Sequence, residues 1–216
     1  MSITAKLQRY EGRELSVTYD ATRCIHAAEC VRGLPGVFDP RAKPWIQPGN
    51  LDADSLAAVI YRCPTGALKL ERGDGASEPI ATTNTATLTL DGPTYLRGDL
   101  ALLAGDGTVA LADTRMALCR CGASQNKPLC DGSHRKAGFR HAGTFAASET
   151  PPANVGGGQL TIRQRPNGPL MCTGPLVVVG TDGRAAFAES TFLCRCGASA
   201  NKPYCDGTHK KIGFTA

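Results

Sequence analysis

The sequence predicts a multi-domain α+β protein, in which a small α+β N-terminal domain precedes two β-rich units. The stretch 118–134 recurs at 193–209, which indicates a repeated domain. Glycine (25 residues) and proline (14 residues) are plentiful and aromatic residues make up only 6%, a composition typical of small domains rich in turns. Polar segments containing Gly, Ser or Pro, at 71–79 and 148–158, separate three parts of the chain. The expected domains are residues 1–74, 80–147 and 155–216.

The N-terminal domain contains one clear helix signal. Residues 55–62 (SLAAVIYR) have apolar residues at helical spacing. Asp52 or Asp54 can cap the N-terminus of this helix. We expect the helix to end at Cys63-Pro64, because the residue before a proline disfavours helical geometry.

Each repeated unit predicts a β-hairpin followed by a motif rich in cysteine. Apolar, β-prone runs flank a Gly-Asp-Gly turn in 100–113 and a Thr-Asp-Gly turn in 175–189. The segments 134–139 and 209–214, which follow the two motifs, predict a short helix that leads to a closing aromatic residue. The metal motif is therefore expected to lie between strands and a short helix.

Charge and hydropathy limit the partners of this chain. The formal net charge is +5, but no run of Lys and Arg alternates with aromatic residues, so we expect no nucleic-acid binding. No stretch approaches the roughly 20 apolar residues that a membrane-spanning helix requires. The first residues lack the apolar segment of a signal peptide and contain acidic residues that transit peptides avoid. We expect a cytoplasmic protein without membrane contact.

Ten cysteines are the most informative part of the composition. In a reducing compartment, clustered Cys and His indicate metal binding rather than disulfides. Only Cys172 stands apart from the clusters, and we interpret it as a packing residue. The clustered cysteines are Cys24, Cys30 and Cys63; Cys119, Cys121 and Cys130; and Cys194, Cys196 and Cys205.

Both copies of the repeated motif read C-x-C-x2-S-x3-P-x-C-D-G-[S/T]-H. The C-x-C pair can direct two thiolates toward one centre, and the histidine lies one helical turn past the third cysteine. The glycine before the Ser or Thr permits a tight turn. The aspartates (Asp131, Asp206) can cap the short helix. The serines (Ser124, Ser199) can donate a hydrogen bond toward a ligating thiolate or an inorganic sulfide.

Three cysteines and one histidine are also a legitimate tetrahedral zinc set, so ligand type alone leaves zinc and iron equally open. The spacing favours iron, because zinc folds usually supply paired C-x2–4-C knuckles and this motif does not.

The motif resembles the CDGSH iron–sulfur domain of mitoNEET-like proteins, and departs from it only at Thr208. This resemblance implies one [2Fe–2S] cluster per motif, hence two in the chain. It also implies that the two units pack as a pseudo-two-fold pair, because tandem members resemble the homodimer of single-motif members joined in one chain. We accordingly expect a monomer with an internal pseudo-dimer. The ligands that the resemblance implies are Cys119, Cys121, Cys130 and His134, and Cys194, Cys196, Cys205 and His209.

The stretch "RCIHAAEC" (23–30), with "RCPTGALKL" (62–70), resembles the divergent single-cluster ferredoxin family over residues 8–70. This resemblance implies a small ferredoxin-like α+β domain whose cluster is bound by Cys24, Cys30 and Cys63. Alanine stands where such ferredoxins have the middle cysteine, and alanine cannot bind iron. Three readings of the site remain: three cysteines hold a [3Fe–4S] cluster, His26 supplies the fourth ligand of a [4Fe–4S] cluster, or His26 only forms a hydrogen bond beside the cluster. Residues 33–40 and Trp45 are expected to keep water away from the cluster.

These cofactors predict electron transfer with redox partner proteins. The alternative is iron–sulfur cluster transfer or storage with apo-protein acceptors, or redox and pH sensing, because an imidazole ligand can be protonated near neutral pH. We expect no enzymatic activity, since nothing resembles a nucleophile–base pair, a phosphate loop or a dinucleotide fingerprint.

Overall fold

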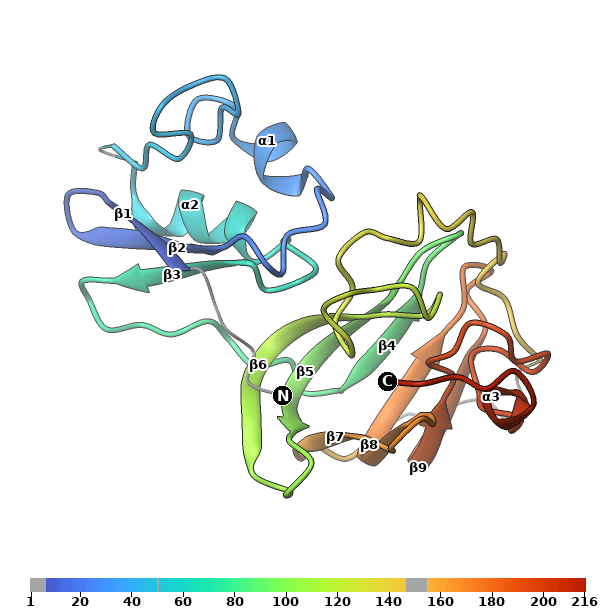
Figure 1. Ribbon diagram of the computed structural model, residues 1–216. Helices are drawn as coiled ribbons and strands as arrows, with labels where there is room; N and C mark the ends of the chain where they lie inside the picture. The colour runs from blue at the N-terminus through green and yellow to red at the C-terminus, as the bar shows by residue number, and fades with distance from the viewer. Residues whose placement is uncertain (1–6, 50, 147–154) are drawn as a thin grey trace. The chain divides into compact units, whose positions relative to one another are not determined.

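The computed structural model describes residues 7–49, 51–146 and 155–216 (Figure 1). These residues divide into two compact units, with the boundary between Pro79 and Ile80. No helix in the described part of the chain has both the length and the apolar character needed to cross a membrane. The two units are described separately below.

The N-terminal unit is a three-stranded antiparallel sheet with two short helices. Its elements are β1 (Leu7–Glu11), β2 (Leu15–Asp20), α1 (Glu29–Gly33), α2 (Ala53–Ile60) and β3 (Leu68–Arg72), and the strand order is β1-β2-β3. Helix α2 packs on β3 and α1 packs on α2. The core combines both element types, and its buried residues are Leu15, Val17, Val37, Phe38, Ile46, Leu56, Val59, Ile60 and Leu68.

Helix α2 matches the expected helix at its start and is shorter at its end. Asp52 is the N-cap, and its side chain accepts a hydrogen bond from the Ser55 N–H at 2.8 Å. The helix ends at Ile60 rather than at Cys63-Pro64. The reason is a tightening of the backbone, in which the Arg62 and Cys63 N–H groups bond to carbonyls only three residues earlier.

The C-terminal unit is one six-stranded sheet built from both repeats. Its hairpins β5–β6 and β8–β9 lie where the sequence predicted them. The elements are β4 (Thr85–Leu88), β5 (Thr94–Leu103), β6 (Val109–Leu118), β7 (Leu160–Gln164), β8 (Leu170–Val179), β9 (Ala185–Leu193) and α3 (Thr208–Lys211).

The two repeats exchange strand pairings reciprocally. Strand β4 pairs antiparallel with β5 of its own repeat and parallel with β8 of the other repeat. Strand β7 pairs antiparallel with β8 of its own repeat and parallel with β5 of the other. Both repeats contribute to a single hydrophobic core, which includes Leu102 and Met116 from the first and Ile162 and Val178 from the second. The repeats therefore form one body rather than two.

The short helix expected after each motif forms only in the second repeat, as α3. Residues 133–138 of the first repeat form successive turns instead. Each copy has one helix-like backbone hydrogen bond between residues four apart. The Ala137 N–H donates to the Ser133 carbonyl in the first copy, and the Ile212 N–H donates to the Thr208 carbonyl in the second. A segment of one helical turn is at the limit of helix formation, so small differences in hydrogen-bond geometry decide its class.

Candidate metal centres

The end of each hairpin positions the first and third cysteines of each motif. Strand β6 ends at Leu118, and the Cys119 N–H then donates to the Pro128 carbonyl at 2.8 Å. The Cys130 N–H returns a hydrogen bond to the Ala117 carbonyl, also at 2.8 Å. The second repeat has the same pair of bonds: the Cys194 N–H donates to the Pro203 carbonyl, and the Cys205 N–H donates to the Phe192 carbonyl.

The predicted ligands of each motif lie in two close pairs. In the first motif the Cys119 and Cys121 Sγ atoms are 3.7 Å apart, and Cys130 Sγ is 3.4 Å from His134 Nδ1. A tetrahedral metal bound about 2.3 Å from two sulfurs would separate them by about 3.8 Å. Each pair therefore fits half of the coordination shell of one metal ion. The second motif has the same pairing, with distances of 3.8 Å for Cys194–Cys196 and 3.4 Å for Cys205–His209.

The paired arrangement suits a two-metal cluster better than a single zinc ion. Within the described ranges, no group of three or more Cys, His, Asp or Glu side chains converges on a site for one ion. A zinc ion would require all four donors of a motif around one point. A [2Fe–2S] cluster places two protein ligands on each iron. The donor set therefore fits the two-iron group.

Each motif aspartate connects the loop after the second cysteine to the turn before the histidine. Asp131 accepts hydrogen bonds from the Ser133 N–H at 2.9 Å and from the Gln125 N–H at 2.8 Å. Asp206 accepts the equivalent bonds in the second motif. Asp206 does not itself cap α3, because the N-cap position is Gly207. The aspartates fix the loop between the second and third cysteines and the turn before the histidine.

The motif serines bond differently from the prediction. The Ser124 hydroxyl donates to the Leu129 carbonyl at 2.6 Å, and the Ser199 hydroxyl donates to the Tyr204 carbonyl at 2.7 Å. A hydroxyl has one hydrogen, so neither serine can also donate to sulfur in this arrangement. The backbone N–H of Ser124 bonds to the Cys119 thiol instead.

Backbone N–H groups also point at the other thiols. Ala123 N–H donates to Cys121 Sγ and Gly132 N–H donates to Cys130 Sγ, both at 3.4 Å. Gly132 has φ +87°, a conformation in which a side chain would be strained. Such donors stabilise a thiolate and raise the reduction potential of a bound cluster.

Hydrogen bonds and burial shift the pKa values of the first-motif groups in both directions. A hydrogen bond from Cys121 lowers the pKa of Cys119 to about 6, whereas burial raises the pKa of Cys130 to about 11. Burial, together with the positive charge of Arg135, lowers the pKa of His134. The imidazole is therefore neutral at pH 7 and can offer a nitrogen lone pair to a metal.

Sequence reasoning missed the arginine between the first two cysteines of each motif. Arg120 is 2% exposed and donates to the carbonyls of Gly92 and Thr89. Its guanidinium also lies 5.4 Å from the centre of the Phe139 ring. Arg195 is placed equivalently in the second motif, over Phe214. The repetition of C-R-C was a signal that could have found both residues.

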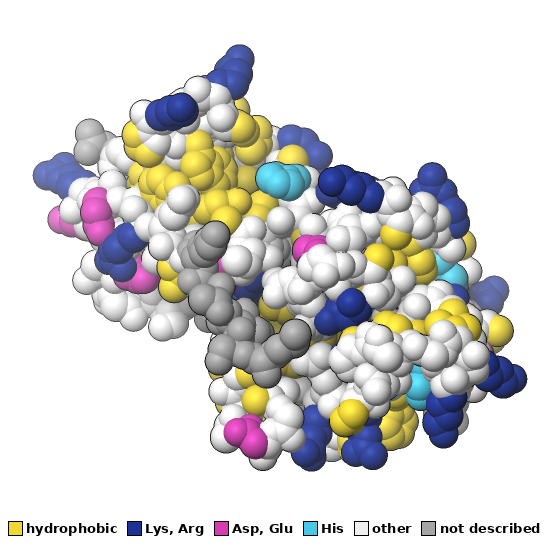
Figure 2. Space-filling model, viewed as in Figure 1, with side chains coloured by type: hydrophobic (Ala, Val, Ile, Leu, Met, Phe, Trp, Pro, Cys, Tyr) yellow, Lys and Arg dark blue, Asp and Glu magenta, His cyan; other side chains and the backbone are white. Residues whose placement is uncertain are grey.

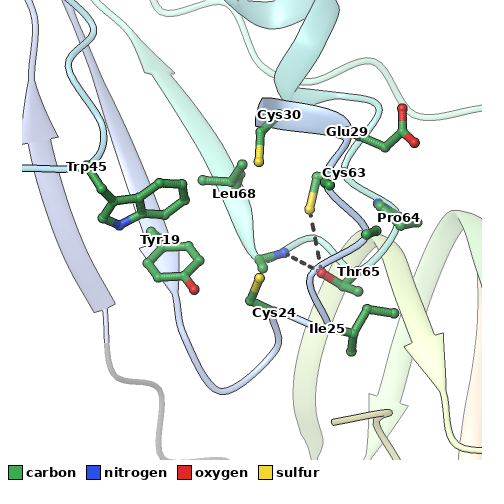
Figure 3. Close-up of a pocket in the computed structure, with 13 residues that line it drawn as sticks. Tyr19, Cys24, Ile25, Glu29, Cys30, Trp45, Cys63, Pro64, Thr65 and Leu68 are labelled. Atoms are coloured by element: carbon green, nitrogen blue, oxygen red, sulfur yellow. Dashed lines mark hydrogen bonds between the residues drawn. The ribbon is translucent and has the colours of Figure 1, made fainter. Parts of the chain in front are cut away.

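The three cysteines of the N-terminal unit line one cavity (Figure 3). Cys24 follows β2, Cys30 lies in α1, and Cys63 follows α2, so three separate elements supply the thiols. Figure 3 shows the sulfurs of Cys30 and Cys63 pointing toward the side where Cys24 lies. Burial raises the pKa of Cys30. Three thiols facing one cavity fit an iron–sulfur cluster that has three cysteine ligands.

Ala27 and His26 lie differently around this cavity. Ala27 lines it, and an alanine side chain has no atom that could bind a fourth iron. His26 is exposed and lines a neighbouring surface groove together with Cys24 and Cys30, but it does not line the cavity that all three thiols share. The structure therefore places His26 in a groove with two of the three cysteines, and not in the cavity that Cys63 completes. The cause is local, since His26 and Ala28 both have positive φ (56° and 65°) and the chain turns sharply between them.

Aromatic side chains close the same cavity. Trp45 lines it, and the Trp45 ring packs edge-on against Tyr19, with the ring centres 4.9 Å apart. Burial and a hydrogen bond with Cys24 raise the pKa of Tyr19. Tyr19 is thus a second residue that sequence reasoning missed, because nothing in the strand sequence indicates which thiol it meets. On the face seen in Figure 2, hydrophobic side chains gather over the N-terminal unit.

Cys172 lies apart from all these sites. It is 1% exposed within the core of the C-terminal unit, and burial raises its pKa to about 12. This placement agrees with its interpretation as a packing residue.

Comparison with known proteins connects these sites to two families. The family described as "Divergent 4Fe-4S mono-cluster" matches residues 10–73, and the family described as "Iron-binding zinc finger CDGSH type" matches residues 91–135 and 167–210. The uncharacterized protein YjdI, from Escherichia coli K12 and from Escherichia coli O157:H7, is 40% identical over 60 residues. That match covers 28% of this chain and 79% of each relative. The chain therefore belongs to the tandem CDGSH iron–sulfur family, in the form that carries an N-terminal divergent mono-cluster domain.

Proposed function

We propose that this protein transfers electrons between redox partner proteins, using two [2Fe–2S] clusters and one [3Fe–4S] cluster. The observation that carries the proposal is the combination of two paired Cys3His sets with a third set of thiols in one chain. Bound clusters supply one-electron redox chemistry. Three centres in one short chain suit a relay, whereas simple cluster donation has no use for a third, different centre.

The three-iron form of the N-terminal cluster is supported by the cavity residues. Three thiols face the cavity, Ala27 occupies the middle position, and His26 lies outside it. A [3Fe–4S] cluster needs three cysteines, while a cubane needs a ligand on its fourth iron.

The reciprocal pairing of β4 with β8 and of β7 with β5 supports a pseudo-two-fold arrangement of the repeats. We accordingly infer a monomer with an internal pseudo-dimer. We infer a cytoplasmic location, because clustered Cys and His indicate metal binding in a reducing compartment. We infer no enzymatic activity of its own.

Metal and EPR analysis of anaerobically purified protein tests the proposal. We expect about four iron atoms from the repeats and about three from the N-terminal unit, with matching inorganic sulfide. An oxidised-state EPR signal near g of about 2.01 is expected from the three-iron cluster. Zinc in place of iron, without visible absorption, would contradict the proposal.

Cluster transfer is the second candidate function, and it is favoured by the exposure of the second motif. Cys205 and His209 are half-buried, whereas Cys130 and His134 are buried. Mixing the protein with an apo-ferredoxin, and separately with a flavin reductase, distinguishes the two functions. Rapid reduction and reoxidation without loss of cluster supports electron transfer, and cluster loss to the acceptor supports cluster transfer.

The same difference in exposure predicts the order of cluster loss in acid. Protonation of the histidine ligand competes with iron binding. His134 is buried and His209 is half-buried, so water and protons reach His209 more readily and the first-repeat cluster should persist after the second-repeat cluster is lost. The visible absorption should decay in two phases below pH 6.5, the unperturbed pKa of histidine being about 6.5. A single phase that includes both clusters would contradict this order.

Tyr19 is expected to tune the N-terminal cluster. Tyr19→Phe removes the hydroxyl that bonds to Cys24 and keeps the ring against Trp45. Loss of a hydrogen bond to a ligating thiolate should lower the reduction potential by an amount on the order of tens of millivolts. Tyr10→Phe is the matched control, because Tyr10 also packs on Trp45 but bonds to Gln8. Equal potentials for both variants in an EPR-monitored titration would refute a role for the Tyr19 hydroxyl.

A further inference from the structure

The two motif loops of the C-terminal unit contact each other through a reciprocal pair of glycines. A Cβ atom placed on Gly122 would lie 2.5 Å from the Cys196 carbonyl oxygen. A Cβ atom placed on Gly197 would lie 2.5 Å from the Cys121 carbonyl oxygen. Each glycine directly follows a predicted ligand of its own motif and faces the backbone of a predicted ligand of the other.

This approach requires glycine for two physical reasons. The residues have φ +79° and +81°, a conformation that side chains rarely adopt. The atoms that a Cβ would meet belong to the opposite backbone, which cannot rotate away as a flexible side chain could. Any larger residue at Gly122 or Gly197 must therefore push the two loops apart.

The buried arginines extend the contact electrostatically. Burial lowers the pKa of Arg120 to about 10, and the negative charges of Asp91 and of Cys194 in the other motif act in the opposite direction. Arg195 has the mirror relationship, in which burial lowers the pKa and Cys119 of the first motif opposes the change.

We propose that Gly122 and Gly197 are positioning residues that join the two cluster sites into one interacting redox pair. The inference rests on the proposed [2Fe–2S] function of both motifs. The ligand residues Cys121 and Cys196 are separated across the interface by a single non-covalent backbone contact on each side. An electron added to one cluster then disfavours addition to the other, and this coupling is reciprocal. The contact between the ligand backbones also predicts a dipolar interaction between the spins of the two clusters.

The test is a redox titration of the intact protein, monitored by EPR, for the native sequence and for Gly122→Ala/Gly197→Ala. The native protein should bind the second electron about fivefold or more less tightly than the first, beyond the statistical factor. Its fully reduced spectrum should be broadened relative to the half-reduced spectrum by dipolar interaction. In the double variant the ratio of the affinities for the first and second electron should move toward one. The dipolar broadening of the fully reduced spectrum should decrease, since dipolar coupling falls with the inverse cube of the distance between the clusters.

Gly183→Ala is the matched control. Gly183 has φ +80° in the second hairpin turn, but no atom lies within 4 Å of a Cβ at that position. It therefore reproduces the backbone strain without the contact between repeats, and it should behave like the native protein. Equal coupling in the native protein, the control and the double variant would overturn the inference.

The native protein alone keeps the inference testable if the double variant does not fold. Identical spectral shapes at half and full reduction would overturn it, while additional broadening at full reduction would support it. Absence of any [2Fe–2S] signal would instead refute the proposed function, so the two failures can be distinguished.

Discussion

Replacing His134 with cysteine is expected to lower the reduction potential of the first-repeat cluster by an amount on the order of 100 mV. A thiolate brings a negative charge where imidazole is neutral, which disfavours the reduced state. The variant should also keep its cluster in mild acid, because the ligand that competes with protons near pH 6 is removed. An EPR-monitored titration measures the first effect, and the decay of visible absorption at pH 5.5 measures the second.

His209→Cys should have the same effects on the second-repeat cluster and should abolish the faster phase of acid decay. His26→Ala is the matched control, because His26 is an exposed histidine of the other compact unit. Acid decay that is the same in all variants would show that imidazole is not the labile ligand. Comparing the two cysteine variants also assigns each decay phase to one repeat.

Replacing Ala27 with cysteine is expected to convert the N-terminal cluster from [3Fe–4S] to [4Fe–4S]. Ala27 lines the cavity beside the three thiols, so a sulfur at this position would be available as the fourth ligand of a cubane. The iron content should rise by about one atom per chain, and the oxidised-state signal near g of about 2.01 should disappear. Iron analysis and EPR of the oxidised protein check both results.

Ala27→Ser controls for the change of size with a poorer iron ligand, and it should leave the three-iron signal in place. His26→Ala should leave the iron content unchanged, because His26 lies outside the cavity. A native protein with about four irons in this unit, losing one in His26→Ala, would contradict our interpretation and establish His26 as a ligand.

Local pattern was sufficient to predict much of the secondary structure. The apolar runs around the Gly-Asp-Gly and Thr-Asp-Gly turns predicted both hairpins. Asp52 and Asp54 were both candidates for the N-cap of the helix, and the N-cap in the structure is Asp52. Turns and helix caps depend on residues only a few positions apart in the sequence, so a local pattern is sufficient to predict them. The single-turn helix after the first motif was predicted wrongly, because one turn has too little cooperativity to be decided by local preference.

The bonding of individual polar groups was harder to predict. Ser124 was expected to donate to sulfur, yet its hydroxyl donates to the Leu129 carbonyl, and a backbone N–H takes the expected role. Arg120 was missed because the Gly92 and Thr89 carbonyls that it binds are distant in the sequence. Tyr19 was missed because the sequence does not indicate which thiol its hydroxyl meets, and the structure shows that it is Cys24.

The sequence by itself determined the family and the candidate ligands, because metal-binding motifs are short and their spacing is written in consecutive residues. Only the tertiary structure decided that both repeats share one sheet and one core, that His26 lies outside the cavity lined by all three thiols, and that Gly122 and Gly197 bring the two motif loops into contact. These outcomes depend on strand exchange and on backbone turns that join distant segments. Such contacts are set by the packing of the whole unit, which no local pattern specifies.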